Sequence, residues 1–265
     1  MKNKFHKLIG LPLADILKFL AAAGFIIWLM YRGTEKTGYN WQWYRVFRYV
    51  CSFDDGRFVI GPLLDGLIVT VRITVYSLVA MFFFGLLSAL FRLSDSFLAK
   101  ILARGYIELI RNTPLLVQLF FIYFVISPVL DIGRFTSAVL ALSLFEGAYA
   151  SEIFRAGIVS IHKSQWEAAY SQGFTGFQTC RFIIFPQAVR RILPPLTGQS
   201  ISLLKDSALV STIAIYDLTM QGQAIISETY LTFEIWFVLA GIYLVLAMVI
   251  SMGVQRLEKR FKVET

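Results

Sequence analysis

The sequence predicts an all-α integral membrane protein with about six transmembrane helices. Hydrophobic residues make up 57% of the 265 positions and charged residues only 16%, whereas an average soluble domain is about 25% charged. Long apolar segments recur along the chain, and about 20 mainly apolar residues are enough to cross a bilayer core. Because no run of Gly, Ser and Pro separates two halves, we expect the spans to form one body.

Six segments account for the expected spans. They cover residues 16–31, 73–91, 112–130, 135–160, 186–204 and 235–255. The second, third and sixth contain no formally charged residue, so each satisfies the requirement for a span directly. The fourth contains acidic and basic residues, the fifth is interrupted by Pro194 and Pro195, and the first is short, with Lys18 near one end.

The distribution of Lys and Arg predicts the orientation. With a cytoplasmic amino terminus, the inside segments hold Lys2, Lys4, Lys7, Arg92, Lys100, Arg104, Arg111, Arg155, Lys163, Arg181, Arg190, Arg191, Arg256, Lys259, Arg260 and Lys262. Since these are most of the 25 basic residues and cytoplasmic loops attract basic residues, both termini are expected inside. The loop over residues 32–61 is the exception, and its aromatic residues indicate a segment on the outer leaflet.

A short polar helix is expected between the fourth and fifth spans, over residues 164–173. Ser164 and Glu167 have the spacing of a capping box, in which each side chain bonds an amide at the start of the helix. Ala168 and Ala169 favour helix, and Gly173 can adopt the left-handed conformation that ends one. The flanking residues are polar or basic, so this helix is expected in water at the membrane surface.

Several motifs give the chain a family resemblance. They are Glu167-Ala168-Ala169 with Gly173 and Phe185-Pro186, Arg111 to Leu119 (RNTPLLVQL), Ala148-Tyr149 with Glu152 and Arg155, and Leu204 to Leu209 (LKDSAL). In this order they resemble the permease subunits of ABC importers, in particular the polar amino-acid branch (histidine, glutamine and glutamate permeases). The resemblance implies a five-helix type I importer core over residues 61–260. Residues 1–60 would be an extension with one additional transmembrane helix and an extracytoplasmic segment.

The same resemblance implies how the chain is driven and with what it assembles. Residues 164–173 would be a coupling helix that docks on a separate ATPase, with Trp166, Glu167, Ala168, Ala169 and Gly173 as its coupling residues. Partners would be ABC ATPase subunits, a second permease subunit, identical or similar, an extracytoplasmic substrate-binding protein, and lipid of the bacterial inner membrane. ATP and Mg would bind the ATPase, because this chain has no Gly-x-x-x-x-Gly-Lys-Ser/Thr loop and needs no cofactor of its own.

Polar residues inside the spans are the candidates for the substrate pathway, since they are costly in lipid. The candidates are Arg72, Gln118, Glu146, Gln199 and Ser202. Glu146 either pairs with Arg72 or faces the solute, and Gln118 either contacts solute or, as we favour, hydrogen-bonds between helices. Glu152 and Arg155 stand three residues apart and are expected to pair with each other as an internal brace.

Three proline sites are expected to shape the helices. Thr113 and Pro114 fit the cap and first residue of a helix, and Pro186 belongs to the motif after the polar helix. Pro194 and Pro195 remove backbone donors inside a span, so we expect a kinked helix that lines the passage, with polar groups such as Gln199 and Ser202.

Other classes of protein fit the sequence less well. The net charge of +8 could suggest nucleic acid, but the basic residues lie at helix ends, where anionic lipid attracts them. Two His and two Cys stand too far apart for a metal site, and no catalytic set is apparent. The main alternative is a secondary transporter or channel in which Glu146 and Arg72 relay protons or ions.

Overall fold

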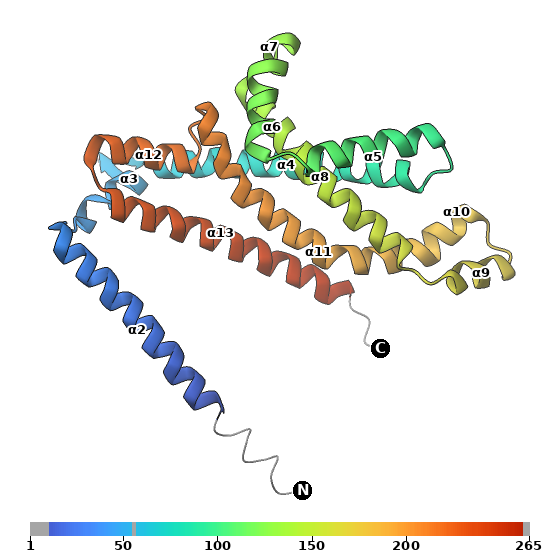
Figure 1. Cartoon of the computed structure of the whole chain (residues 1–265), viewed down its shortest axis with the longest axis horizontal. Coiled ribbons are helices and arrows are strands. Elements are labelled where there is room, and N and C mark those ends of the chain that lie inside the picture. The colour runs from blue at the N-terminus through green and yellow to red at the C-terminus, as the bar shows by residue number, and fades with distance from the viewer. Residues whose placement is uncertain (1–10, 55–56, 262–265) are drawn as a thin grey trace, which may run out of the picture. The chain divides into compact units, whose positions relative to one another are not determined.

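The computed structural model describes residues 11–54 and 57–261, and helices occupy all six expected spans (Figure 1). In chain order the elements are α2 (Leu11–Thr37), η1 (Trp43–Arg45), α3 (Phe47–Val50), β1 (Cys51–Asp54), β2 (Arg57–Ile60), α4 (Pro62–Leu93), α5 (Phe97–Arg111), α6 (Leu115–Phe121), η2 (Ile122–Ile126), α7 (Ser127–Leu130), α8 (Arg134–Val159), α9 (Lys163–Ser171), α10 (Gly176–Thr179), η3 (Cys180–Ile184), α11 (Phe185–Asp206), η4 (Ser207–Ile213), α12 (Leu218–Thr229) and α13 (Thr232–Phe261). The chain separates into two compact units, one up to Trp43 and one from Tyr44 onward.

The first unit contains α2, whose stretch Ile16–Gly33 is long and apolar enough to cross a membrane. None of this stretch is buried inside the chain. Its apolar side chains, among them Phe19, Phe25 and Trp28, therefore need lipid or another protein around them.

The second unit contains, directly after α3, an element that an all-α prediction misses, the antiparallel hairpin of β1 and β2, paired from Cys51↔Ile60 to Asp54↔Arg57. Gly61 follows the hairpin and donates its amide to the Val50 carbonyl at 2.9 Å. A Cβ atom at Gly61 would lie 2.4 Å from the Tyr49 carbonyl oxygen, so only glycine allows this close return of the chain.

The core of the second unit is built on α4 and α8, which run in the same direction. Near their starts, the rings of Tyr76 and Phe135 lie 5.8 Å apart, and further along Gly85 packs against Gly147 and Ala150. Small residues at these positions let the two backbones approach closely, as in other membrane helix pairs. Buried apolar residues of α4, α6, α8 and α11 then form one continuous cluster.

α11 runs in the opposite direction along α8, and the two helices cross at Gly157. A Cβ atom at Gly157 would lie 2.2 Å from Cγ1 of Ile192. Gly157→Ala is therefore expected to force Ile192 aside, at a cost of about 1–3 kcal/mol, and to lower the melting temperature in detergent. Gly105→Ala on α5 is the matched control, because its Cβ meets nothing within 4 Å and helix propensity slightly favours alanine. An equal effect of the two changes would contradict the crossing.

The third expected span, residues 112–130, differs from a straight helix. α5 and the α6–α7 segment meet at an angle of 108°, and the span itself begins only at Leu115. Within it, η2 is π-helical, which locally changes the direction in which side chains point. The expected span over residues 112–130 is therefore present, but its helix begins at Leu115 and is set at an angle to α5.

The two ends of the second unit carry different elements. α12 lies beside the start of α4, where the Leu218 amide donates to Thr70 Oγ1 at 3.0 Å. α9 and α10 follow the end of α8, at the opposite end of the bundle (Figure 1). Because α4 and α8 are parallel, their carboxyl-terminal ends lie at the end of the bundle from which α9 follows.

Candidate functional site

The polar helix expected at residues 164–173 is present as α9, but its amino-terminal cap differs from the prediction. The helix begins at Lys163, with His162 as the capping residue, and His162 Nδ1 accepts the Ser164 amide at 3.2 Å. Ser164 is thus the second residue of the helix and cannot cap it, while Glu167 pairs with Lys163 at 3.4 Å. The predicted capping box was wrong here. A capping box does occur a few residues later, between Thr175 and Gln178 at the start of α10.

The carboxyl-terminal end of α9 agrees with the prediction. Gly173 has φ of +81°, in the left-handed region that glycine enters without steric cost. Its amide donates to the Tyr170 carbonyl at 3.0 Å, and the Phe174 amide donates to the Ala169 carbonyl at 3.1 Å. These two bonds form a Schellman motif, which fixes the end of the helix and the direction of the chain after it.

The coupling residues predicted on α9 point in two directions. Ala169 is buried, with 1% of its surface exposed, and Trp166 packs against the main apolar cluster. Glu167 and Ala168 are exposed, as is the adjacent Tyr170. Trp166 and Ala169 can therefore hold α9 to the membrane helices, which leaves the surface around Glu167 and Ala168 free to contact another protein.

Glu152 lies at the centre of an ion cluster that joins three helices. As predicted, Arg155 donates to its Oε2, at 3.0 Å from Nη2. The structure adds Arg92 at the end of α4, which donates to Oε1, and Arg111 at the end of α5, whose Nη1 lies 3.9 Å from the same oxygen. One carboxylate thus compensates three guanidinium groups, and Arg111 also lies over the ring of Tyr149.

Glu146 is fully buried near the middle of α8. Gln199 Nε2 on α11 donates to its Oε2, so the structure brings two predicted pathway residues together. Arg72, the partner that the sequence analysis considered for Glu146, is exposed on α4, and no ion pair joins the two residues in the part of the chain that the structure describes. The sequence could not distinguish these partners because α4 and α11 both lie close to α8.

Gln118 and Thr113 hold the corner between α5 and α6. Gln118 Nε2 donates to the Ile110 carbonyl and to Thr113 Oγ1, each at 2.7 Å, which is the interhelical bonding we favoured. Thr113 Oγ1 in turn donates to the Leu109 carbonyl at 2.9 Å. Pro114 is the capping residue rather than the first helical residue, and no side chain caps α6. The predicted Thr-Pro cap was therefore wrong, because Thr113 bonds backwards to α5.

α11 carries one apolar and one polar side. Ile192, Leu196 and Leu203 are buried, and from Arg191 onward the exposed residues are Arg191, Pro194, Pro195, Gly198, Ser202 and Lys205. Pro186 lies in its first turn, where a missing amide needs no partner, and the helix continues through the proline pair.

A cavity of about 440 Å³ adjoins this polar side. Glu152, Gly157 and Ser160 line it from α8 and the residue after it, and Arg191 and Pro195 line it from α11. Since Pro195 has no amide hydrogen, the carbonyl four residues earlier lacks its helical donor. Exposed polar groups of this kind in a membrane helix are tolerated beside water or protein.

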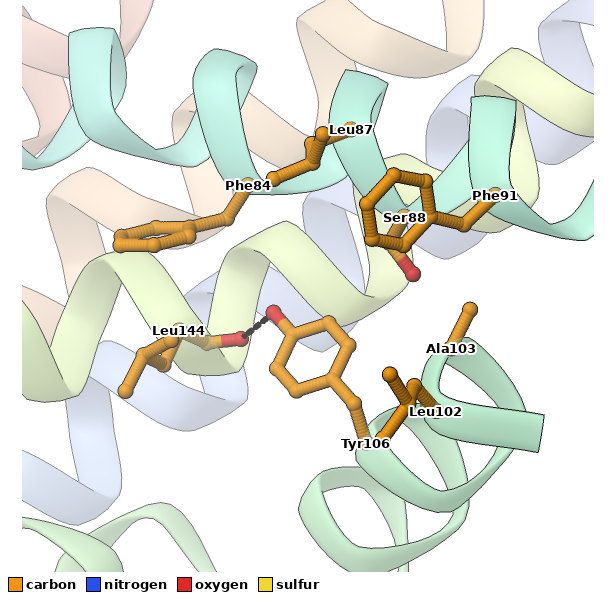
Figure 2. A pocket seen from close by; sticks show the side chains of 8 residues that line it. All are labelled: Phe84, Leu87, Ser88, Phe91, Leu102, Ala103, Tyr106 and Leu144. Carbon is orange, nitrogen blue, oxygen red and sulfur yellow. Dashed lines mark hydrogen bonds between the residues drawn. The ribbon is translucent and has the colours of Figure 1, made fainter. Parts of the chain in front are cut away.

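A second cavity, of about 190 Å³, lies between α4, α5 and α8 and is mainly apolar (Figure 2). Tyr106 reaches across it and donates its hydroxyl to the Leu144 carbonyl at 2.6 Å. Its other lining residues include Phe84, Leu87 and Phe91, which suit an acyl chain better than a polar solute. Within the described residues, no group of three or more His, Cys, Asp or Glu is arranged to hold a metal ion.

Asp217 is a buried acid that the sequence reasoning missed, although an Asp directly before a helix is a recognisable capping signal. Its Oδ1 accepts the Met220 amide at 2.9 Å at the start of α12, and Tyr243 of α13 donates to Oδ2 at 3.4 Å. Burial raises the pKa of Asp217 from 3.8 to about 6, although the bonds from Met220, Thr219 and Tyr243 act in the opposite direction.

The raised pKa of Asp217 predicts a pH-dependent stability. A folded-state pKa above the unfolded value contributes stability that is fully present below pH 3.8 and is lost as the pH rises through 6. Asp217→Asn retains a capping oxygen without the charge, so we expect a melting temperature roughly 3–6 °C above wild type at pH 8 and a clearly smaller difference at pH 4.5. Asp65→Asn, on an exposed acid of α4, is the control; a parallel gain there would contradict the assignment.

These features define a multi-span permease subunit, with a polar helix outside the membrane and no ATP-binding loop of its own. Residues 81–263 match the family described as binding-protein-dependent transport system inner membrane component, and the chain belongs to this family. The glutamine transport system permease protein GlnP of Escherichia coli K12 is 39% identical over 207 residues, which cover 77% of this chain and 94% of that protein. The probable glutamine ABC transporter permease GlnM of Bacillus subtilis is 36% identical, covering 75% and 93%.

Solved structures agree with this membership. An amino acid ABC transporter crystallised with histidines matches with a TM-score of 0.69 and 40% identity, over 75% of this chain and 94% of that one. The inward-facing MetNI methionine ABC transporter has a TM-score of 0.63 at 18% identity, over 76% and 96%, and shares the fold. The chain is thus an ABC importer permease of the inner membrane, and the resemblance drawn from the motifs is confirmed.

Proposed function

We propose that this chain imports polar amino acids as one of two permease subunits, driven by separate ATPase subunits and supplied by an extracytoplasmic binding protein. The observation that carries this proposal is α9, a short helix whose inner side is packed on the bundle and whose outer side is free. The named relatives are glutamine permeases, and a solved relative is an amino acid transporter. ATP and Mg would bind the ATPase.

The orientation is part of the same proposal. α9 lies at the end of the bundle that holds Arg92, Arg155 and Arg191, with α12 at the other end. Since basic residues favour the cytoplasmic side, the α9 end would be cytoplasmic, where an ATPase is found. α13 starts beside α12 and α4, so its carboxyl-terminal end would also be cytoplasmic; the amino terminus is proposed to be on the same side.

The solute would pass along the polar side of α11. This helix presents Pro194, Pro195 and Ser202 on its exposed side, and Gln199 links it to Glu146. A change in the packing of α11 against α8 would open the route alternately to the two sides, with nucleotide binding to the ATPases biasing the two states.

Reconstitution tests the proposal. The permease, its partner ATPase and its binding protein are placed in proteoliposomes, and uptake of labelled L-glutamine, L-histidine, L-lysine and L-arginine is measured with ATP on the ATPase side. We expect uptake of at least one of them that requires ATP and the binding protein. Uptake by the permease alone, driven by an ion gradient, would contradict the proposal and favour a secondary transporter.

A further inference from the structure

A free hydroxyl group lies on the wall of the apolar cavity between α4, α5 and α8. Ser88 of α4 lines this cavity, and only 6% of its surface is exposed. Its Oγ atom has no hydrogen-bond partner among the residues that the structure describes. Figure 2 shows this atom pointing from α4 toward Tyr106 and Ala103 of α5. Because a buried hydroxyl without a partner costs free energy, it indicates a bonding group that comes from outside the chain.

The cavity suits a hydrocarbon chain better than water. Its volume is about 190 Å³, and an apolar cavity of about 150 Å³ is already large enough for benzene. A buried water molecule needs two to four polar partners, but among the described residues of the wall only Ser88 and Tyr106 have polar side chains. Tyr106 already donates its hydroxyl to the Leu144 carbonyl. The occupant therefore has an apolar body and a polar group that bonds Ser88.

The cavity is continuous with the surface that the spans present to the bilayer. Leu87 and Phe91 of α4 and Leu102 of α5 line the cavity and are also exposed. Leu98, one turn earlier on α5, is exposed as well. Since residues 73–91 form a span without formal charge, an exposed apolar surface here is covered by acyl chains. The cavity is thus open to lipid from the side.

A cationic group lies one turn beyond Ser88. Arg92 stands four residues later on the same face of α4, about 6 Å further along the helix axis, and is the first charged residue after the span. It belongs to the cluster in which the Glu152 carboxylate faces three guanidinium groups, so the cluster retains excess positive charge. The hydroxyl and the guanidinium therefore follow each other toward the membrane surface in the same order as the ester and the phosphate of a phospholipid.

We infer that the cavity binds one acyl chain of an anionic phospholipid, whose ester carbonyl accepts the Ser88 hydroxyl and whose phosphate lies against Arg92. The lipid belongs to the leaflet at the α9 end of the bundle, which the proposed orientation makes cytoplasmic. Its chain fills the space beside Tyr106 and holds α5 against α4 and α8. Because α5 carries Arg111 to the Glu152 cluster, the bound lipid supports the same three helices that the cluster joins.

Lipid binding to the purified full-length permease tests the inference. Native mass spectrometry counts the lipids bound during titration with dioleoyl phosphatidylglycerol, zwitterionic dioleoyl phosphatidylethanolamine, and dioleoylglycerol, which lacks the phosphate. Anionic lipid gains about 1 kcal/mol for each basic residue at the surface. We therefore expect one phosphatidylglycerol to bind about 5- to 10-fold more tightly than either of the other two lipids. Inorganic phosphate at millimolar concentration is expected not to displace it, because the acyl chain contributes most of the affinity.

Three variants locate the site. Ala103→Leu fills the cavity from its wall, so the fold persists and the first phosphatidylglycerol is expected to bind at least about 10-fold more weakly. Ser88→Ala removes one neutral hydrogen bond and is expected to cost about 3- to 10-fold. Ser77→Ala is the matched control: Ser77 is also buried on α4 without a hydrogen-bond partner for its hydroxyl, but it does not line this cavity. This control is expected to bind as wild type.

A phosphatidylglycerol with a photoreactive diazirine in one acyl chain shows where the lipid lies. We expect cross-links within residues 84–91 and 102–106 that Ala103→Leu removes and Ser77→Ala retains. Unchanged affinity in both Ala103→Leu and Ser88→Ala would overturn the inference, as would cross-links confined to other parts of the chain. Equal affinity for phosphatidylglycerol and dioleoylglycerol would exclude a site for the phosphate. Displacement by inorganic phosphate would assign the binding to a free anion at the arginine cluster.

Discussion

Glu152→Gln is expected to lower the melting temperature of the purified permease by about 5–10 °C, corresponding to a loss of about 2–3 kcal/mol. The change removes the negative charge that faces Arg92, Arg155 and Arg111 and leaves three guanidinium groups close together. Breaking a fully buried ion pair costs roughly 3–5 kcal/mol. The expected loss is smaller because 27% of the Glu152 side chain remains exposed to solvent.

A second ion pair of the same chain provides the control for Glu152. Glu167 pairs with Lys163 on α9, but its side chain is 62% exposed, and exposed pairs contribute at most about 1 kcal/mol. Glu167→Gln is thus expected to shift the melting temperature by no more than about 2 °C. Thermal unfolding in one detergent, followed by tryptophan fluorescence, compares both variants. Equal shifts would show that the Glu152 cluster does not join α4, α5 and α8.

The Glu152 cluster also shows which contacts a sequence can predict. The pair with Arg155 was predictable because the two residues stand three apart on one helix. Arg92 and Arg111 were not, since they arrive from α4 and α5, and the sequence does not state which helices pack together. Hydropathy is a property of each segment by itself, so it predicted where the spans lie. The 108° turn between α5 and α6 could not be predicted in this way, because it depends on hydrogen bonds around Gln118 that join the two helices.

α11 is the span that hydropathy alone represents least well. It lacks a sufficiently apolar stretch to count among the candidate spans, because one of its sides is polar, and the sequence indicated it through prolines, polar residues and its place among the motifs. Its contact between Gln199 and Glu146 could not be distinguished in advance from a pair with Arg72. The local sequence was also ambiguous about the start of α9, because both His162 and Ser164 can cap a helix. In the structure Ile161 is buried in the core, and the next residue, His162, caps the helix.

The exposed side of α9 leads to the prediction with the largest expected effect on transport. Ala168→Arg places a long charged side chain where the proposed ATPase would approach, and Ala168 is exposed, so the fold should tolerate it. Truncation or obstruction at the centre of an interface typically costs about 2–4 kcal/mol, which is a factor of about 30–1,000 in affinity. We therefore expect the ATPase to dissociate on purification and ATP-driven uptake to fall at least about 30-fold, with an unchanged melting temperature.

Two comparison variants separate a lost contact from a damaged fold. Gln223→Arg introduces the same side chain at an exposed position of α12, at the opposite end of the bundle, and is expected to transport as wild type. Ala169→Arg affects the neighbouring buried residue and is expected to lower the melting temperature as well as transport, because α9 can no longer pack on the membrane helices. If the Ala168→Arg variant kept its ATPase and transported normally, the ATPase would have to contact the permease at a site other than the exposed side of α9. The proposed coupling route would then be wrong.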